Sequence, residues 1–511
     1  MEFNSILNLR KSPYEELQRE VFFEDLNINQ IIQRICAGWG EEVESYYYYL
    51  PADVACEEYR AGVYSDIKAG EVFEALSTYE EQVSNQLEMQ VNKEKVSNKM
   101  QKAVWHIREV ECYCNALISL YEKLEGFCLR SDGMTSLKAY LKTYLESDAF
   151  LDLNGTSEAL LGEIRSFRLK LQYQGDRILV SEEQTNGNYD NFLKTCFPKK
   201  DNKFKNPFSA TVELTAFERE VIRVFRKNHE ETFKKIEEFY RRTIDYRDEK
   251  LSLFQKEIRY YLSFYSFERE MKEKGCSFAA PGKALNGEIE VLGLYDLALA
   301  CVNLQEDKPV VSNDFCYEKE DTFIVLTGPN QGGKTTFARS LGQLIYFTKM
   351  GLDVPAVSAV VSDFTRILTH FSVEESIETG RGKLKEELIR LKPMMQEHFQ
   401  GAFVIINELF TTAANYDACI MGKKVIQHFI EQGCRGIYVT HLKELTQAHE
   451  SVVSAKAMVD ENKRQTFRVC RGEPLESAYA INQVNKYQLT YEQIMERLAK
   501  KQIGKNVEEV F

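Results

Sequence analysis

The sequence predicts a multi-domain protein that is mainly α-helical and carries one α/β domain in its C-terminal half. The 511 residues exceed the length of one ordinary domain and correspond to roughly three or four. Only 10 prolines and a charged fraction of 28% are typical of a helical body. An apolar strand pattern, a glycine-rich loop and a helical pattern follow one another over residues 322–350. The α/β domain is therefore expected around this loop.

Charge, cysteine content and hydropathy exclude several classes of protein. Lys and Arg total 65 against 78 Asp and Glu, a net charge of −13, so a nucleic-acid contact would require a local basic patch. The 12 cysteines form no CxxC pair and no Cys/His metal spacing, so reduced thiols are expected. Because there is no signal-peptide pattern and no run of about 18 apolar residues, we expect a soluble, cytoplasmic protein without a membrane segment.

The first half of the chain is predicted to be helical. Residues 1–115 alternate apolar and charged positions at helical spacing and are expected to form a helical core. Residues 116–274 are expected to form long lever helices that carry a small β-containing clamp at residues 165–206. Within the lever, residues 211–274 contain neither glycine nor proline. This predicts one long helix or two stacked helices with a combined length of about 95 Å.

The clamp region contains a β pattern followed by a lysine cluster. Residues 167–180 alternate with period two around Gln174 and Gly175, which predicts a β-hairpin. A polar stretch at residues 186–206 follows, and local lysines in an acidic chain are candidate contacts to a phosphate backbone. An ordinary solvated loop explains this composition equally well. The candidate nucleic-acid residues are Lys194, Lys199, Lys200, Lys203 and Lys205.

The glycine-rich loop has the pattern of a phosphate-binding P-loop. A buried strand is predicted at Phe323–Thr327 and a helix at residues 335–346, and the sequence between them satisfies GxxxxGK[ST]. Glycines allow backbone N–H groups to surround phosphates, Lys334 supplies a positive charge, and the Thr335 hydroxyl can bind Mg²⁺. The sequence therefore predicts binding of ATP and Mg²⁺. The loop residues are Gly328, Pro329, Asn330, Gln331, Gly332, Gly333, Lys334 and Thr335.

Two further strand patterns end in polar residues. An apolar run at residues 402–406 closes on Asn407 and Glu408, where P-loop ATPases place a residue that supports Mg²⁺ and a carboxylate that orients water. A third strand at residues 436–440 is followed by His441, which would lie near the γ-phosphate. The predicted catalytic residues are Glu408 and His441, with Thr335 and Asn407 at the metal.

These motifs resemble those of the MutS DNA mismatch-repair ATPases, which are relatives of the ABC-type ATPases. TGPNQGGKTT is similar to the family's TGPNMGGKST, VIINELFTTAANYDA to VLMDEIGRGTSTYDG, and VTHLKELT to ATHYFELT. Order and spacing agree over residues 310–490, and weaker similarity extends through the lever into the helical core. The resemblance implies an ABC-type P-loop ATPase domain at residues 275–490, a C-terminal helix at 491–511 as a candidate dimer contact, and no N-terminal mismatch-reading domain.

The resemblance also implies roles for individual residues. Thr336 joins the loop residues in binding phosphates, and a signature loop of the partner subunit contacts each ATP. That loop corresponds here to residues 379–384, in which Gly380 and Arg381 are kept, while Gly382 and Lys383 replace the family's serine and threonine. Asn407 stands where the family has aspartate, so an acceptor oxygen remains but the charge is absent.

The expected function is a dimeric MutS-like ATPase that binds mismatched or branched duplex DNA. ATP binding and hydrolysis would open and close the clamp in mismatch repair or recombination, with turnover slowed by Asn407. Two alternatives stay open at this point. One is a low-turnover, nucleotide-binding regulatory module, and the other is a MutS-like ATPase that acts on RNA or ribosomes.

Overall fold

The computed structural model describes residues 3–7, 20–51, 53–167, 169–174, 177–182, 214, 216–372, 382–460, 464–474, 490–495 and 497. The chain divides into two compact units: the first contains residues 1–11 and 58–265, and the second contains residues 12–57 and 266–511. This division differs from the predicted segments 1–115, 116–274 and 275–490. Residues 12–57 group with the C-terminal half instead of with the helical core.

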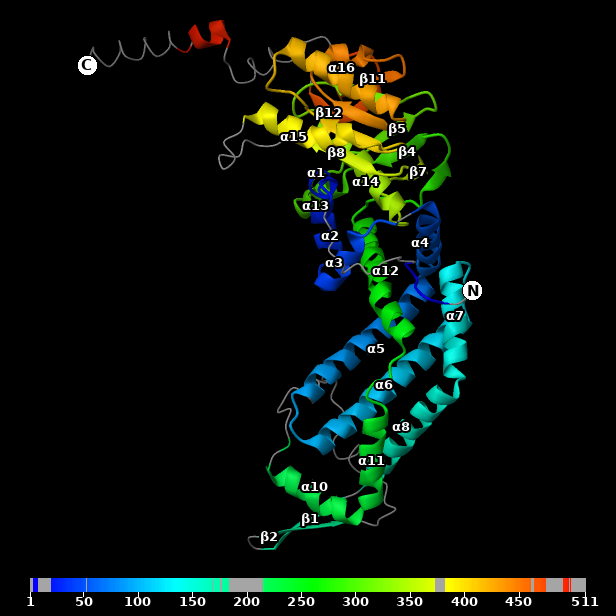
Figure 1. Cartoon of the computed structure of the whole chain (residues 1–511). Helices are drawn as coiled ribbons and strands as arrows, with labels where there is room; N and C mark the ends of the chain where they lie inside the picture. Colours follow the sequence, from blue (N-terminus) through cyan, green and yellow to red (C-terminus); the bar gives the residue numbers. More distant parts are fainter. Residues whose placement is uncertain are drawn as a thin grey trace, which may run out of the picture. The chain divides into compact units, whose positions relative to one another are not determined.

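The first unit is built from long helices whose starts are determined locally. Asn98, Ser131 and Ser147 each accept a backbone hydrogen bond from the first turn of the following helix. α5 packs along α6, and α8 and α11 pack against α6 (Figure 1). The helices are α4 (Val54–Ile67), α5 (Gly70–Glu94), α6 (Lys99–Glu125), α7 (Asp132–Leu145), α8 (Asp148–Ser166), α10 (Ala216–Asn228), α11 (Glu230–Arg242) and α12 (Glu249–Glu273). The chain passes between the units within α4 and α12.

The predicted hairpin is confirmed. β1 (Leu169–Gln174) pairs antiparallel with β2 (Arg177–Glu182), and the turn falls between Gln174 and Arg177. The lysine cluster that follows it, from Lys194 to Lys205, lies outside the described residues.

The prediction of one or two helices over residues 211–274 is wrong, because the described part of this segment forms α10, α11 and α12. α10 ends before His229, whose ring packs against Phe225 at a centroid distance of 4.3 Å. α11 ends at Arg242, and the N–H and the hydroxyl of the following Thr243 both donate to the Phe239 carbonyl, at 3.0 and 2.7 Å. Asp248 then caps α12 by accepting from the N–H of Leu251 at 2.9 Å. The segment is thus divided into three helices although it has no glycine or proline.

The N-terminal residues are bound to α12 through a buried carboxylate. Glu257, whose exposed fraction is 0%, accepts from the Ser5 hydroxyl at 2.6 Å and from the Ile6 N–H at 2.8 Å. Phe3, Ile6 and Leu7 are buried in the same unit. Burial raises the pKa of Glu257 from 4.5 to about 7, although these hydrogen bonds oppose the rise.

The second unit contains two sheets. The six-stranded sheet has the order β12-β11-β6-β10-β9-β8, in which all neighbours are parallel except β11 and β12. Its strands are β6 (Phe323–Thr327), β8 (Ile367–Phe371), β9 (Phe403–Asn407), β10 (Arg435–Val439), β11 (Val452–Val459) and β12 (Gln465–Arg471). The second sheet, in the order β3-β7-β4-β5, contains β3 (Gly282–Ala284), β4 (Ile289–Leu294), β5 (Asn313–Tyr317) and β7 (Ser358–Ser362).

Helices around these sheets complete the unit, and α14 is the most deeply buried of them. It contacts β8, β9 and β10 of the large sheet, as well as β4 and α13. A Cβ atom at Gly342 would lie 2.5 Å from the Leu26 side chain and 2.8 Å from that of Ile405, so only glycine fits there. The helices are α1 (Phe22–Asp25), α2 (Ile28–Ile35), α3 (Glu41–Tyr47), α13 (Leu297–Gln305), α14 (Lys334–Lys349), α15 (Lys383–Gln396), α16 (Asn415–Glu431) and the 3₁₀ helix η2 (Lys443–Gln447).

Packing against α14 explains why residues 12–57 belong to the second unit. The ring of Phe23 lies 5.8 Å from that of Tyr346 on α14, and the Tyr346 hydroxyl donates to the Tyr47 carbonyl at 2.7 Å. α1 also contacts β8. A helical unit together with mixed sheets agrees with the predicted multi-domain class. Within the described residues, no helix combines the length and apolar character that a membrane span needs.

The raised pKa of Glu257 predicts that the first unit becomes less stable as pH rises. The folded state holds its proton more tightly than the unfolded state, so this stabilising contribution is complete below pH 4.5 and is lost as pH rises through 7. The shift corresponds to about 3 kcal/mol. Urea unfolding followed by Trp105 fluorescence in a Trp39→Phe background should show this loss of stability between pH 5 and 8, and Glu257→Gln should largely remove it.

The exposed Glu122→Gln is the matched control for this experiment and should keep the pH dependence of the parent. If the stability of the parent and of Glu257→Gln falls in parallel across this pH range, then Glu257 is not the titrating group.

Candidate functional site

The glycine-rich loop has the backbone conformation that its glycines allow. It connects β6 to α14, as the sequence predicted. Gly328, Gln331 and Gly333 have φ angles of 144°, 60° and 85°. At Gly332, a Cβ atom would lie 2.9 Å from the Pro329 carbonyl oxygen. A side chain is therefore excluded at Gly332, whereas Gln331 adopts a positive φ angle with its side chain in place. The N-terminus of α14 directly follows the loop, which is the arrangement that binds anions.

Lys334 begins α14, and its side chain folds back over the loop. Its ammonium donates to the carbonyl oxygens of Gly328 at 3.1 Å and Pro329 at 2.9 Å. Only 4% of Lys334 is exposed, and burial lowers its pKa, although the charge of Glu408 opposes this change. The ammonium therefore already lies at the loop where the sequence predicts phosphates.

Thr335 and Asn407 meet at the carboxyl ends of β6 and β9. The Thr335 hydroxyl donates to Asn407 Oδ1 at 2.9 Å, so the two predicted metal residues are brought together. Both offer the neutral oxygen atoms that Mg²⁺ accepts, and Glu408 is the next residue along the chain. No cluster of three or more His, Cys, Asp or Glu side chains suited to a metal occurs among the described residues. The donor set thus fits a cation that takes its other ligands from phosphate and water.

Glu408 and His441 form the second polar pair at this edge. His441 Nε2 lies 3.1 Å from Glu408 Oε1. This hydrogen bond is the main reason that the pKa of Glu408 is lowered, and the charges of His441 and Lys334 contribute further. Glu408 adopts φ 54°, and its N–H donates to the Val439 carbonyl of β10 at 2.9 Å. The carboxylate is therefore held ionised beside the loop.

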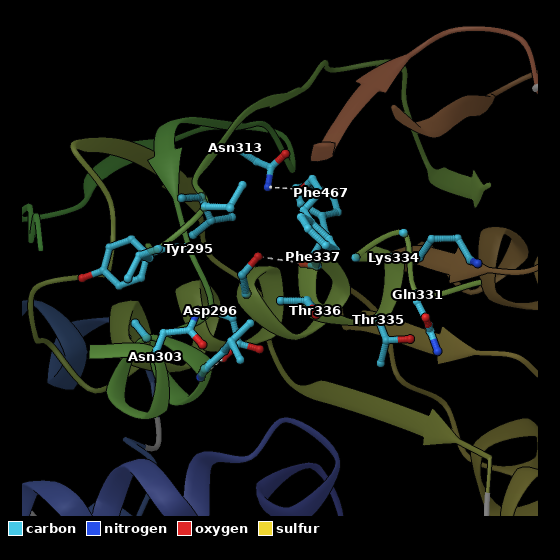
Figure 2. A pocket seen from close by; sticks show the side chains of 18 of the residues that line it. Tyr295, Asp296, Asn303, Asn313, Gln331, Lys334, Thr335, Thr336, Phe337 and Phe467 are labelled. Carbon is cyan, nitrogen blue, oxygen red and sulfur yellow. Dashed lines mark hydrogen bonds between the residues drawn. The ribbon is translucent and has the colours of Figure 1, made fainter. Parts of the chain in front are cut away.

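A pocket of about 440 Å³ extends from the loop toward α13 and β12. Figure 2 shows Thr335, Thr336 and Phe337 on one side of it and Tyr295, Asp296 and Asn303 on another. Apolar side chains such as Leu299, Val311 and Phe337 line much of it. A pocket of this size and lining suits an organic group attached to the phosphates.

Sequence reasoning did not identify the residues that form the far wall of this pocket. Asn313 holds β12 in place because its Oδ1 accepts from the Val469 N–H at 2.7 Å. Its Nδ2 also donates to the Phe467 carbonyl at 3.4 Å (Figure 2). Phe467 has φ 59° and is 45% exposed, which leaves an aromatic face at the pocket. The phosphate-loop motif contains no information about this wall, because the wall comes from distant strands.

The structure brings together most of the predicted site. The loop residues and Thr336 surround the start of α14, and Glu408, Lys334 and Thr335 share the pocket. Asn330 contributes its carbonyl, which accepts from Gln465 Nε2 at 2.8 Å. Gly380 and Arg381 of the signature loop lie outside the described residues.

Comparisons with known proteins identify the same region. The family model for MutS domain V matches residues 324–502. DNA mismatch repair protein msh-2 of Neurospora crassa is 27% identical over 188 residues, which cover 35% of this chain and 20% of that protein. DNA mismatch repair protein spellchecker 1 of Drosophila melanogaster is 26% identical over 208 residues, covering 40% and 23%. DNA mismatch repair protein MutS of a Thermotoga species is 28% identical over 137 residues, covering 27% and 17%. The chain thus matches about a fifth of the length of these relatives.

The position of Lys334 predicts how triphosphate affinity depends on it. Removing the ammonium in Lys334→Ala eliminates a charged hydrogen-bond donor, which should weaken ATP binding by about 10- to 100-fold. Titration with a fluorescent ATP analogue measures this change. The exposed Lys424→Ala on α16 is the matched control and should bind like the parent. Equal affinity in Lys334→Ala and the parent would contradict the role of Lys334.

Proposed function

We propose that the protein is a MutS-family ATPase that couples nucleotide binding and hydrolysis to contacts with DNA, because the family model for MutS domain V matches residues 324–502. The observation that carries this proposal is the convergence of Lys334, Thr335, Asn407, Glu408 and His441 at the carboxyl ends of three parallel strands. In open α/β sheets, ligands bind at this edge. The proposal separates into nucleotide binding, hydrolysis and the response of the rest of the chain.

The nucleotide binds with its phosphates in the glycine-rich loop. Loop N–H groups and the start of α14 surround the phosphates, and Lys334 exchanges its hydrogen bonds to two loop carbonyls for bonds to phosphate oxygens. The nucleoside occupies the pocket beside α13, where Phe467 presents its ring. Asn313 supports this wall of the pocket, because it is hydrogen-bonded to Phe467 and Val469 of β12.

Thr335 and Asn407 are the residues that would hold Mg²⁺ beside the phosphates. The ion, when bound, neutralises charge on the β and γ phosphates. The Thr335 hydroxyl, which donates to Asn407 Oδ1 at 2.9 Å, and the Asn407 amide oxygen would supply the protein's oxygen atoms to the ion. Because an amide carries no charge, this support is weaker than that of an aspartate, which predicts slow turnover.

Glu408 orients the attacking water. Its carboxylate is ionised, since the His441 hydrogen bond lowers its pKa, and it can accept a hydrogen bond from water. His441 follows β10 and holds the carboxylate from the neighbouring strand, which aligns it toward the phosphate end of the pocket. Hydrolysis therefore depends on the pair, whereas nucleotide affinity depends mainly on Lys334.

The remaining part of the proposal concerns DNA and a second subunit. Curated relatives are named as DNA mismatch repair proteins, which supports mismatched DNA as the partner, and branched DNA is proposed beside it. We propose that a homodimer forms composite ATP sites, with Gly380 and Arg381 contacting the nucleotide of the other subunit. Nucleotide turnover then opens and closes the clamp around DNA, and the lysines that follow the hairpin contact its phosphates.

A low-turnover regulatory module is the alternative that a specific observation favours. Asn407 accepts a hydrogen bond from the Thr335 hydroxyl and lacks the negative charge that would hold Mg²⁺ firmly. The site is therefore suited to nucleotide binding with little hydrolysis. ATP affinity and turnover, measured separately, distinguish these two functions. A third hypothesis is that the ATPase binds RNA or ribosomes, and RNA binding is measured together with DNA binding.

Single substitutions of the neighbouring residues Asn407 and Glu408 should have opposite effects on the rate of hydrolysis. Asn407→Asp restores the charge beside the metal and should raise Mg²⁺-dependent turnover by about 10- to 100-fold. Glu408→Gln removes the carboxylate that orients water, so it should suppress turnover while ATP still binds. Steady-state phosphate release across a Mg²⁺ titration measures both effects. No gain from Asn407→Asp at any Mg²⁺ concentration, together with full activity of Glu408→Gln, would favour the regulatory module.

The lysine cluster should account for part of the salt dependence of nucleic-acid binding. Removing one lysine–phosphate interaction should reduce the slope of log K against log salt by about 0.9 for duplex DNA. A variant with all five lysines changed to Ala should therefore bind more weakly and with a flatter slope. Fluorescence anisotropy with matched, mismatched and branched DNA and with structured RNA, with and without ATP, measures this change. The variant residues are Lys194, Lys199, Lys200, Lys203 and Lys205.

The matched control changes exposed lysines of the helical unit to Ala and should keep the parent's slope. These five control residues are Lys95, Lys99, Lys123, Lys142 and Lys227. If the five-lysine variant keeps the parent's slope, the cluster does not bind phosphates. Tighter binding to RNA than to any of the DNA forms would identify RNA as the partner instead of DNA.

A further inference from the structure

One buried carboxylate near the site has no part in the chemistry described above. Glu387 of α15 has an exposed fraction of 0%, and its Oε2 accepts a hydrogen bond from the N–H of Phe410 at 3.1 Å. Phe410 is only two residues from Glu408. A carboxylate is costly to bury, so its position requires a compensating interaction, and this backbone N–H supplies one. Burial raises the pKa of Glu387, while the Phe410 N–H and the charge of Lys383 oppose the rise.

The turn that Glu387 contacts has an unusual backbone. Glu408 and Phe410 have φ angles of 54° and 65°, a left-handed conformation that residues with a side chain seldom adopt. Such residues persist only where the surrounding structure fixes them. Two backbone bonds help here, from Glu408 N–H to the Val439 carbonyl and from Ala413 N–H to the Phe410 carbonyl. Glu387 supplies the side-chain bond that holds the Phe410 amide in the same turn.

α15 is also bound to β8 and α1, through Arg390. Three charged residues, Lys383, Glu387 and Arg390, recur at the spacing of one helix face. Arg390 donates to the Phe371 carbonyl at 3.2 Å and lies 3.3 Å from the carboxylate of Asp25. The middle of α15 is thereby bound to β8 and α1, and Glu387 connects this helix to the turn that presents Glu408.

We propose that Glu387 is a positioning residue for the reaction, which holds the Glu408 carboxylate in its productive orientation through the Phe410 amide. The inference rests on the proposed function and deepens it, because it identifies what aligns the residue that orients water. When Glu387 no longer accepts this bond, the turn can relax toward an unstrained backbone. Glu408 then leaves its alignment with His441, whereas Lys334 and the loop stay in place.

The chemistry of Glu387 offers a test that separates a hydrogen bond from packing. Within the described residues its second oxygen, Oε1, has no hydrogen-bond partner, so only one acceptor is in use. Glu387→Gln keeps an acceptor oxygen for the Phe410 N–H. Glu387→Met fills a similar volume without an acceptor. Exposed Lys392→Met on the same helix is the matched control.

The experiment compares kcat, KM and ATP affinity in these three variants and the parent. Glu387→Met should lower kcat by about 10- to 100-fold, since small misplacements near the chemistry are that costly. KM and ATP affinity should stay within about twofold, and Glu387→Gln should recover most of the parent's kcat. Hydrogen–deuterium exchange of the peptide that contains Phe410 should be faster in Glu387→Met than in the parent.

The outcomes distinguish the two levels of the proposal. A parent that binds ATP but shows no turnover, together with an unaffected Glu408→Gln, overturns the proposed function itself. If the parent hydrolyses ATP and Glu387→Met does so at the same rate, only the role of Glu387 is overturned. The role is also overturned if affinity, turnover and thermal stability fall to the same extent in the Met and Gln variants, since this is the result of a general packing defect.

Discussion

The parallel register of β6, β10 and β9 is the constraint on which the candidate site depends. In this register Val439 pairs with both Leu326 and Asn407, so the three strands end at the same level. The residues just beyond those ends must then converge, and Thr335 meets Asn407 across 72 positions of sequence. A slip of one position in any strand would turn its inward side chains to the opposite face, so register and site are specified together.

Deep packing keeps the polar groups at this edge in defined positions. Lys334 and Asn407 are only 4% and 7% exposed, an environment in which an unpaired ammonium or amide would be costly. Each has a partner within the protein, two loop carbonyls for Lys334 and the Thr335 hydroxyl for Asn407. In the proposed function, phosphate oxygens and Mg²⁺ would take the place of these existing partners, so the side chains would need little rearrangement. The close packing at Gly342 of α14 serves the same purpose, because it seats the helix that carries Lys334.

Buried carboxylates have a related role in both units. Glu387 holds the turn that presents Glu408, and Glu257 holds the N-terminal residues against α12. In each case the carboxylate accepts a backbone N–H, which compensates part of the cost of burial. For Glu257 the compensation is incomplete, and its pKa rises to about 7. These groups make segments that are distant in sequence depend on one another.

Local pattern alone determined much of this protein: the β6–loop–α14 unit, the strands that end at Asn407 and before His441, the hairpin, and the resemblance to the MutS family. These features are encoded by nearest neighbours, through glycines that allow positive φ and through apolar runs that form buried strands. Tertiary structure alone decided that Phe23, Leu26 and Tyr47 contact α14. It also decided that Asn313 and Phe467 form a pocket wall and that Glu387 holds the Glu408 turn. Each of these depends on an interaction between segments far apart in the chain, and such interactions cannot be predicted from local periodicity.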